Sequence, residues 1–230
     1  MKSALQTEQA AGIITSDDVI LVAVAHPDDE TVFHAEYIRR AVAAYAKVHI
    51  AYATMGEAST INSRFWHPGF VRKNGREKEI QKATRRMDIS QDAVHLGHLP
   101  DGKLQNHLDE LTAWLAELIK ANDITKVLTA GPKGYDKHPD HIAVDTAVLQ
   151  AKNKIGKPIT VLRLDAKGNG RVVLQVNTFH KLRATLSHFS QFPGFCIFGH
   201  IFLFKRTKKY LKKYRALAYE KETYTTGHTV

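Results

Sequence analysis

The sequence is poor in cysteine and in long apolar runs. Among its 230 residues there is one cysteine, Cys196, which excludes an internal disulfide and a zinc site built from several cysteines. No apolar run approaches the ~20 residues that a membrane-spanning helix needs. Residues 1–18 have no continuous apolar stretch behind a basic cluster, so we expect no secretory signal. These absences favour a protein of the reducing cytoplasm.

What is present is the composition of an ordinary globular protein. Hydrophobic residues make up 43% of the chain and charged residues 24%, which excludes wholesale disorder and collagen-like chains. A compact chain of this length buries about 70% of its unfolded surface, which is enough for a substantial core. Because the sequence has no internal repeat, low-complexity segment or long linker, we predict a single domain over 1–230.

Apolar runs rich in β-branched residues alternate with segments of helical spacing. We expect strands at 19–25, 48–54, 93–96 and 126–130, and helices at 31–46, 72–87, 107–121 and 139–152. This alternation predicts an α/β fold with a Rossmann-like, mainly parallel sheet flanked by helices. Further along, strand-like runs at 158–164 and 171–176 flank the glycines of 167–170. They predict a small C-terminal β-hairpin, which a helix at 179–189 then follows.

Histidines and carboxylates follow two of these strands at their C-terminal ends. The first strand ends in the sequence AHPDDE at 25–30, and the fourth is followed by a loop and then by HPDH at 138–141. Ligands of open α/β sheets bind at the carboxyl ends of the strands, and charged groups there must be paired, solvated or bound to a cation. A solvated turn with a helix cap would explain either cluster alone. Together they predict a His/Asp site for Zn²⁺ or another divalent ion.

Six short motifs, in order along residues 19–191, resemble those of the PIG-L/LmbE-like de-N-acetylases, a family of zinc-dependent enzymes that act on N-acetylglucosamine conjugates. The two most specific are the AHPDDE and HPDH segments. The weaker ones are ATMGE at 53–57, Arg76 with Glu79, LGHLPDG at 96–102 and HKLRATLSHFSQ at 180–191.

The resemblance implies a metal-dependent hydrolase that removes acetyl from an N-acetylated amino-sugar conjugate and releases acetate and a free amine. His26, Asp29 and His141 would bind one Zn²⁺, or another divalent metal, per chain. Three protein ligands leave a coordination position for water, whose pKa falls towards ~7 on zinc. Asp28 would act as the general base, and His138 would stabilise charge or protonate the leaving amine.

The same resemblance suggests which residues bind the sugar. Arg76 and Asp101 match family positions that line the sugar pocket, and Glu57 and His188 are further candidates. Without the resemblance, Arg76 and Asp101 could equally be surface charges. His188 could equally be a buried histidine that holds the late helix against the sheet. The loop 59–70, which contains Trp66, is a candidate lid over the pocket.

The basic charge is concentrated near the C-terminus, in the aromatic and basic segment 192–230. The chain has 33 Lys and Arg against 23 Asp and Glu, a net charge of +10, and the run KRTKKYLKKYR at 205–215 has seven basic residues and no acidic ones. Either this run is a solvated basic helix, or the segment 192–215 makes peripheral contact with an anionic membrane. A module that binds nucleic acid would use the same run but leave both His/Asp clusters without a role, so we do not expect a nucleic-acid partner. A different metallohydrolase, such as another single-metal amidohydrolase or a phosphoesterase, is the remaining alternative for the function. The sequence does not indicate whether the protein is a monomer or an oligomer.

Overall fold

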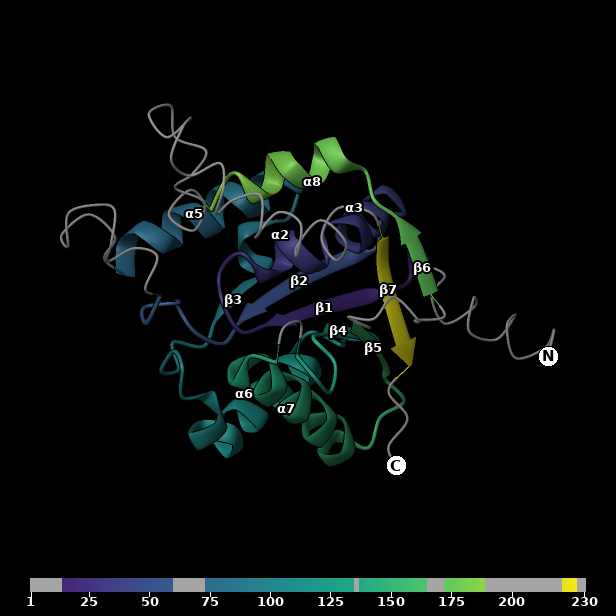
Figure 1. Ribbon diagram of the computed structural model, residues 1–230. Coiled ribbons are helices and arrows are strands. Elements are labelled where there is room, and N and C mark those ends of the chain that lie inside the picture. Colours follow the sequence, from purple (N-terminus) through teal and green to yellow (C-terminus); the bar gives the residue numbers. More distant parts are fainter. Residues whose placement is uncertain (1–13, 60–72, 135–136, 165–171, 189–220, 227–230) are drawn as a thin grey trace.

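The computed structural model describes residues 14–59, 73–134, 137–164, 172–188 and 221–226. They form a sheet with helices on both faces (Figure 1). The strands of this sheet are β1 (Val19–Val24), β2 (Lys47–Tyr52), β3 (Val94–Leu96), β4 (Lys126–Thr129), β5 (Thr160–Leu164), β6 (Val172–Gln175) and β7 (Lys221–Thr226). Their order across the sheet is β3-β2-β1-β4-β5-β7-β6. The five strands from β3 to β5 are parallel, as predicted, and β7 runs antiparallel to both of its neighbours.

Strand β1 lies at the centre of the parallel part because its sequence, VILVAV, suits burial on both faces. It pairs with β2 on one side, where Val19 is opposite Lys47, and with β4 on the other, where Ile20 is opposite Lys126. Since β1 and β4 are parallel neighbours, the segments that follow them leave the sheet side by side. This arrangement brings the two His/Asp clusters to one edge.

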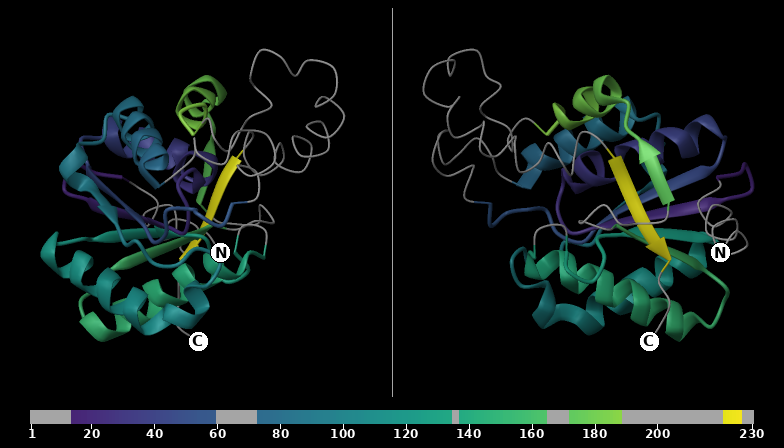
Figure 2. Two further views of the ribbon diagram at one scale, coloured as in Figure 1. Left: turned by 90° about the vertical axis from the view of Figure 1, so that its left-hand side faces the viewer. Right: turned by 45° about the vertical axis from the view of Figure 1, so that its right-hand side comes forward.

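The helices form two layers, as Figure 1 and Figure 2 show. They are α2 (Asp29–Phe33), α3 (Ala35–Ala43), α5 (Lys73–Arg86), α6 (Leu108–Ala121), α7 (Pro139–Ile155) and α8 (Thr178–Thr185). The helices α2, α3, α5 and α8 cover one face of the sheet, and α6 and α7 cover the other. Each layer has its own apolar core, with Ile20, Ile50 and Tyr37 in the first and Leu21, Leu111 and Val148 in the second.

Two expectations about local structure were wrong. The helix predicted over 31–46 is broken at His34, a buried residue with φ −127° that ends α2 and precedes α3. The predicted hairpin does not form either, because β7 lies between β5 and β6 and pairs with both. The short sequence of β7, KETYTT, is rich in Thr and Tyr, which favour strands, but it contains no run of apolar residues.

Several predictions fall outside the described residues. They are the lid over 59–70, of which only Ser59 is described, the turn at 167–170 and the membrane contact through 192–215. All three stay predictions, as does the single domain over 1–230. None of the helices in the described ranges is both long and apolar enough to cross a membrane.

Candidate metal centre

The first half of the site follows strand β1. The chain runs from Val24 through His26 into α2, where Oδ2 of Asp29 accepts the backbone N–H of His26 at 2.9 Å. Asp28 lies between the two with φ 126°, a conformation that costs a residue other than glycine about 1–3 kcal/mol. Its N–H donates to Oε2 of Glu30 at 3.0 Å. This hydrogen bond helps to hold the strained turn that projects all three side chains beyond the sheet.

The second half of the site is the start of helix α7. His138 caps this helix, since its Nδ1 accepts the backbone N–H of Asp140 at 3.2 Å, and Pro139 follows in the first turn. Because Nδ1 is the acceptor here, the proton of the neutral ring is on Nε2. The ring of His138 lies 4.9 Å from that of His26 and 5.0 Å from that of His141, centroid to centroid. The HPDH motif therefore places two imidazoles against the first motif.

Three side-chain atoms converge where the two halves meet. His26 Nδ1 lies 3.2 Å from His141 Nε2, His141 Nε2 lies 3.2 Å from Asp29 Oδ2, and His26 Nδ1 lies 3.5 Å from Asp29 Oδ2. A tetrahedral ion with bonds of 2.0–2.2 Å separates its ligand atoms by roughly 3.3–3.6 Å. The triangle thus has the size that a zinc-like ion requires, and two imidazoles with a carboxylate are donors that suit it. The residues present fit the predicted metal.

A second group of carboxylates orients His26. Its Nε2 lies 3.0 Å from Oδ1 of Asp101 and 3.3 Å from Oδ2 of Asp140. Asp140 is fully buried and also accepts the backbone N–H groups of Gly102 and Leu104, at 2.6 and 3.0 Å. Metal-binding histidines commonly donate their second ring N–H to such a carboxylate, which fixes the tautomer and the ring orientation. The sequence analysis did not predict this role for Asp140. Its position between the candidate residues His138 and His141 could have indicated that it belongs to the site.

Asp28 has the electrostatic environment of a base that works near neutral pH. Burial and the charge of neighbouring Asp29 raise the pKa of Asp28 to about 7, against the opposing positive charges of His188 and Arg76. By contrast, the pKa of Asp29 is held well below its usual value. Burial alone would raise it, but contacts with His141 and His26 outweigh that effect. Adjacent carboxylates with such different pKa values are typical of functional sites.

Arg76 is buried and reaches the site from helix α5. Its guanidinium lies against the backbone of Gly56, where a Cβ atom would be only 1.6 Å from Nη1. Gly56 also has φ +64°, so both its conformation and its lack of a side chain serve this contact. Within the described residues the Nε atom of Arg76 has no hydrogen-bond partner. A buried guanidinium with an unused donor fits the prediction that Arg76 binds substrate, which stays a prediction.

Glu57 and Asp101 lie at the site, and the side chain of each accepts a hydrogen bond from the backbone of the loop that carries the other. Oε1 of Glu57 accepts the backbone N–H of Asp101 at 2.9 Å, and Oδ2 of Asp101 accepts that of Ala58 at 2.7 Å. The second oxygen of Asp101 faces His26. These contacts indicate that both carboxylates position loops around the candidate metal ligands, and their predicted role in substrate binding remains a prediction.

His188 lies inside the protein and does not line the site. It is fully buried, and its Nε2 lies 2.5 Å from Oε1 of Glu30, which is also fully buried. This position favours the reading of a buried histidine that holds the chain after α8 against the sheet, and it argues against direct contact with substrate. Glu30 is a further residue that sequence reasoning left without a role.

Comparisons with known proteins agree on one family. Residues 21–152 match the family described as PIG-L: GlcNAc-PI de-N-acetylase. The chain is also 30% identical over 190 residues to a Bacillus subtilis protein named as a probable N-acetyl-alpha-D-glucosaminyl L-malate deacetylase 2. That alignment covers 76% of this chain and 84% of the relative.

Solved structures with low sequence identity share the fold. The N,N'-diacetylchitobiose deacetylase of Pyrococcus horikoshii matches with a TM-score of 0.70 at 14% identity, over 99% of this chain and 92% of the other. GalB, the 4-carboxy-2-hydroxymuconate hydratase of Pseudomonas putida, matches with a TM-score of 0.65 at 15% identity, over 93% and 97% of the two chains. Since a hydratase and a deacetylase share this architecture, the reaction must be argued from the site and not from the fold.

Proposed function

Because the chain belongs to the PIG-L family of de-N-acetylases, we propose that it hydrolyses the acetamide of an N-acetylglucosamine-type conjugate with one divalent metal ion, Zn²⁺ by preference. The observation that carries this proposal is the triangle of His26, Asp29 and His141, whose edges of 3.2, 3.2 and 3.5 Å match tetrahedral coordination. These three residues would hold the ion. When bound, it supplies Lewis-acid polarisation and a water of lowered pKa.

Asp28 is the residue that takes the proton of the attacking water. With a pKa of about 7, its carboxylate is available at neutral pH, and once protonated it is acidic enough to give the proton away. Its carboxyl neighbour, Asp29, remains ionised over the same range because its pKa is depressed. Asp28 therefore carries the proton, whereas Asp29 stays negatively charged throughout.

His138 is the residue that stabilises charge on the acetamide oxygen or protonates the leaving nitrogen. Its Nδ1 is engaged by the Asp140 amide, so its Nε2–H is the donor that the ring can direct at substrate. An amide nitrogen leaves only as an amine, so a proton must reach it as the C–N bond breaks. Asp28 and His138 are the two groups of the described site that can deliver it, and acetate and a free amine result.

Release of acetate from defined conjugates tests this function. Purified protein loaded with Zn²⁺ is incubated with N-acetylglucosamine linked to malate, to an inositol phospholipid and to a second N-acetylglucosamine, and acetate and free amine are both measured. The Asp28→Asn variant should lose about 10²–10⁴ in rate, whereas Asp17→Asn, which alters an exposed carboxylate, should not. Absence of acetate from every conjugate, or full activity in Asp28→Asn, would overturn the proposal.

A further inference from the structure

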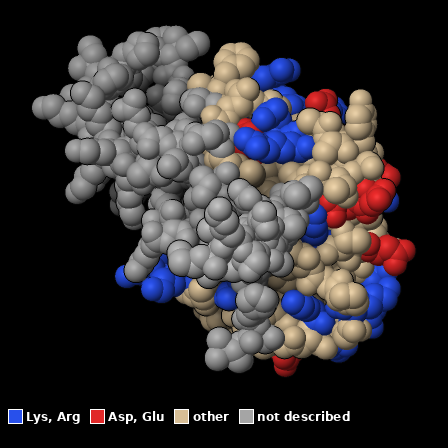
Figure 3. Space-filling view, turned by 90° about the vertical axis from the view of Figure 1, so that its right-hand side faces the viewer, with Lys and Arg blue, Asp and Glu red and all other residues tan. Residues whose placement is uncertain are grey.

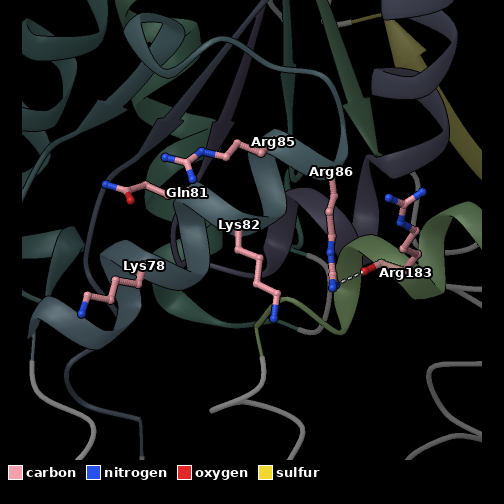
Figure 4. Close-up of a pocket in the computed structure, with 6 residues that line it drawn as sticks. All are labelled: Lys78, Gln81, Lys82, Arg85, Arg86 and Arg183. Carbon is pink, nitrogen blue, oxygen red and sulfur yellow. Dashed lines mark hydrogen bonds between the residues drawn. The ribbon is translucent and has the colours of Figure 1, made fainter.

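A basic groove lies between helices α5 and α8. It has a volume of about 480 Å³ and is lined by Lys78, Gln81, Lys82, Arg85, Arg86 and Arg183. Figure 4 shows the side chains that α5 contributes and Arg86 reaching the backbone of Arg183 on α8. Nη1 of Arg86 donates to the carbonyl oxygen of Arg183 at 2.7 Å and to Oγ of Ser187 at 3.0 Å. These bonds tie the two walls together, so the cations are presented on a fixed frame.

The charge of the basic groove is not balanced by the described part of the chain. Its lining contains no acidic residue, and within the described ranges Lys78, Lys82, Arg85 and Arg183 form no ion pair. On the face drawn in Figure 3, by contrast, Lys and Arg patches alternate with Asp and Glu. Five cations gathered without an ion pair repel one another, so an external anion would stabilise this surface.

The remainder of the chain offers little to fill the basic groove. Its undescribed residues include only four acidic ones, Glu8, Asp136, Asp165 and Glu220, and they are widely separated in the sequence. Outside the described ranges the sequence thus contains no acidic cluster to complement the groove, whereas an anionic partner would supply that charge.

An exposed aromatic residue lies next to the cations. Phe179 is 78% exposed and precedes Arg183 by four residues on α8, so the two share a face of that helix. A large apolar side chain beside several basic ones is the pattern of protein surfaces that rest on lipid, where the ring enters the headgroup boundary and the cations meet the phosphates. A site for one small anion would instead gather its donors around a point, whereas these cations are spread along two helices.

We propose that the basic groove and Phe179 form a docking surface for a membrane rich in anionic phospholipids. A nucleic acid strand is the competing partner, but stacking of bases along a strand uses several exposed aromatic residues in series, and Phe179 is the only one on α5 and α8 in the described ranges. Arg76, which reaches the site, and Lys82 in the groove are six residues apart on α5, about 9 Å along the helix axis.

Vesicle sedimentation with the full chain tests this surface. The probes are vesicles of phosphatidylcholine alone and vesicles with about a third phosphatidylglycerol, at low salt, where each basic residue near an anionic surface contributes about fivefold to binding. Lys82→Ala/Arg85→Ala should therefore bind the anionic vesicles about 25-fold more weakly than the unaltered protein. The matched control is Lys120→Ala/Lys154→Ala, which removes the same charge from exposed positions on α6 and α7. Because every variant retains the basic run 205–215, the difference between the two double variants reports on the groove alone.

Phe179→Ala tests the apolar part of the surface at higher salt, where the charges are screened. It should weaken the remaining binding several-fold, whereas Tyr45→Ala, at another exposed aromatic, should not. The proposal is overturned if the unaltered protein does not prefer anionic vesicles or if the two double variants bind alike. It is also overturned if an oligonucleotide displaces the protein from vesicles at equal phosphate concentration. Zinc-dependent acetate release from a soluble substrate should be unchanged in all four variants, so failure here is distinguishable from failure of the catalytic proposal.

Discussion

Glu30 and His188, 158 residues apart in the sequence, form a fully buried pair with 2.5 Å between Oε1 and Nε2. The other carboxylate oxygen of Glu30 accepts the backbone N–H of Asp28 at 3.0 Å. The pair therefore links the chain that follows α8 to the strained residue proposed as the general base. This relationship gives Glu30, the last residue of the first motif, a structural role that its neighbours do not share.

Removing the imidazole of this pair should strongly destabilise the fold. His188→Leu leaves the Glu30 carboxylate buried without its partner, a change that typically costs about 3–5 kcal/mol of unfolding free energy. Urea unfolding measures the loss. His107→Leu is the matched control, because His107 pairs with Glu110 at 3.2 Å on the surface, and surface pairs contribute little. Equal losses in the two variants would contradict the assigned role of the buried pair.

The contribution of His188 should also depend on pH. Burial by itself would lower the pKa of His188, but Glu30 and Asp28 outweigh it, and the pKa lies above the ordinary 6.5. The folded state thus holds a proton that the unfolded state releases earlier, so the stabilisation is complete below about pH 6.5 and is lost as the pH rises through the folded-state pKa. The difference in unfolding free energy between the unaltered protein and His188→Leu should shrink from about pH 6 to about pH 9. A difference that grows over this range would refute the direction of the shift.

Activity should fall on the acidic side as Asp28 takes up its proton. With a pKa of about 7, the carboxylate is the base above that pH and is neutralised below it, so kcat/KM should rise with pH up to neutrality. A bound cation adds positive charge nearby and moves this midpoint to lower pH. Rates of acetate release from about pH 4 to about pH 8 give the profile. A flat acidic limb would exclude Asp28 as the base.

Metal affinity should depend on Asp140 although it is not one of the three proposed ligands. Asp140→Asn keeps one acceptor oxygen, which can serve the Leu104 amide. It replaces the charged oxygen that faces both Nε2 of His26 and the Gly102 amide by an NH2 group. Such partners of metal-binding histidines typically contribute 10–100-fold to affinity, so competition with a chelator should show a loss of about that size. Asp109→Asn, at an exposed position on α6, is the control. Removal of the metal itself should abolish acetate release, and added Zn²⁺ should restore it.

The parallel sheet was predictable because its strands are continuous apolar runs and its helices have amphipathic spacing. The antiparallel edge was not, because β7 is a six-residue polar strand whose pairing with β5 and β6 depends on contacts made far from it in sequence. The break between α2 and α3 at His34 could not be predicted either, because the apolar residues on both sides of it continue the same helical pattern. The tertiary structure, not the local sequence, decides both features.

The two motifs were enough to predict where the candidate metal site lies. Two His/Asp clusters after parallel strands had to meet at one edge, and His26, Asp29 and His141 do meet there. Which carboxylate does which task could not be derived from order along the chain. Asp101 lies against His26, and Glu30, in the first turn of α2, lies against His188. Such assignments depend on side-chain direction, which a motif does not encode.

The position of the Arg76 guanidinium can be tested through two glycines that differ in what surrounds them. Gly56 and Gly102 have similar backbone conformations, with φ +64° and +77°, so an alanine at either position carries a similar backbone cost of about 1–2 kcal/mol. A Cβ at Gly56 would collide with Nη1 of Arg76, whereas the nearest atom to a Cβ at Gly102 is Cβ of Ala58, at 4.0 Å. The difference between the two variants therefore isolates the displacement of Arg76.

Gly56→Ala should shift the acidic limb of activity to higher pH, and Gly102→Ala should not. The charge of Arg76 opposes the rise in the pKa of Asp28, so moving the guanidinium away lets that pKa rise further. If Arg76 also binds the sugar, KM rises in Gly56→Ala alone. The pH dependence of kcat/KM for acetate release, measured for both variants with one substrate, separates these effects from lost stability. Equal shifts in both variants would mean that backbone strain, not the guanidinium, controls Asp28.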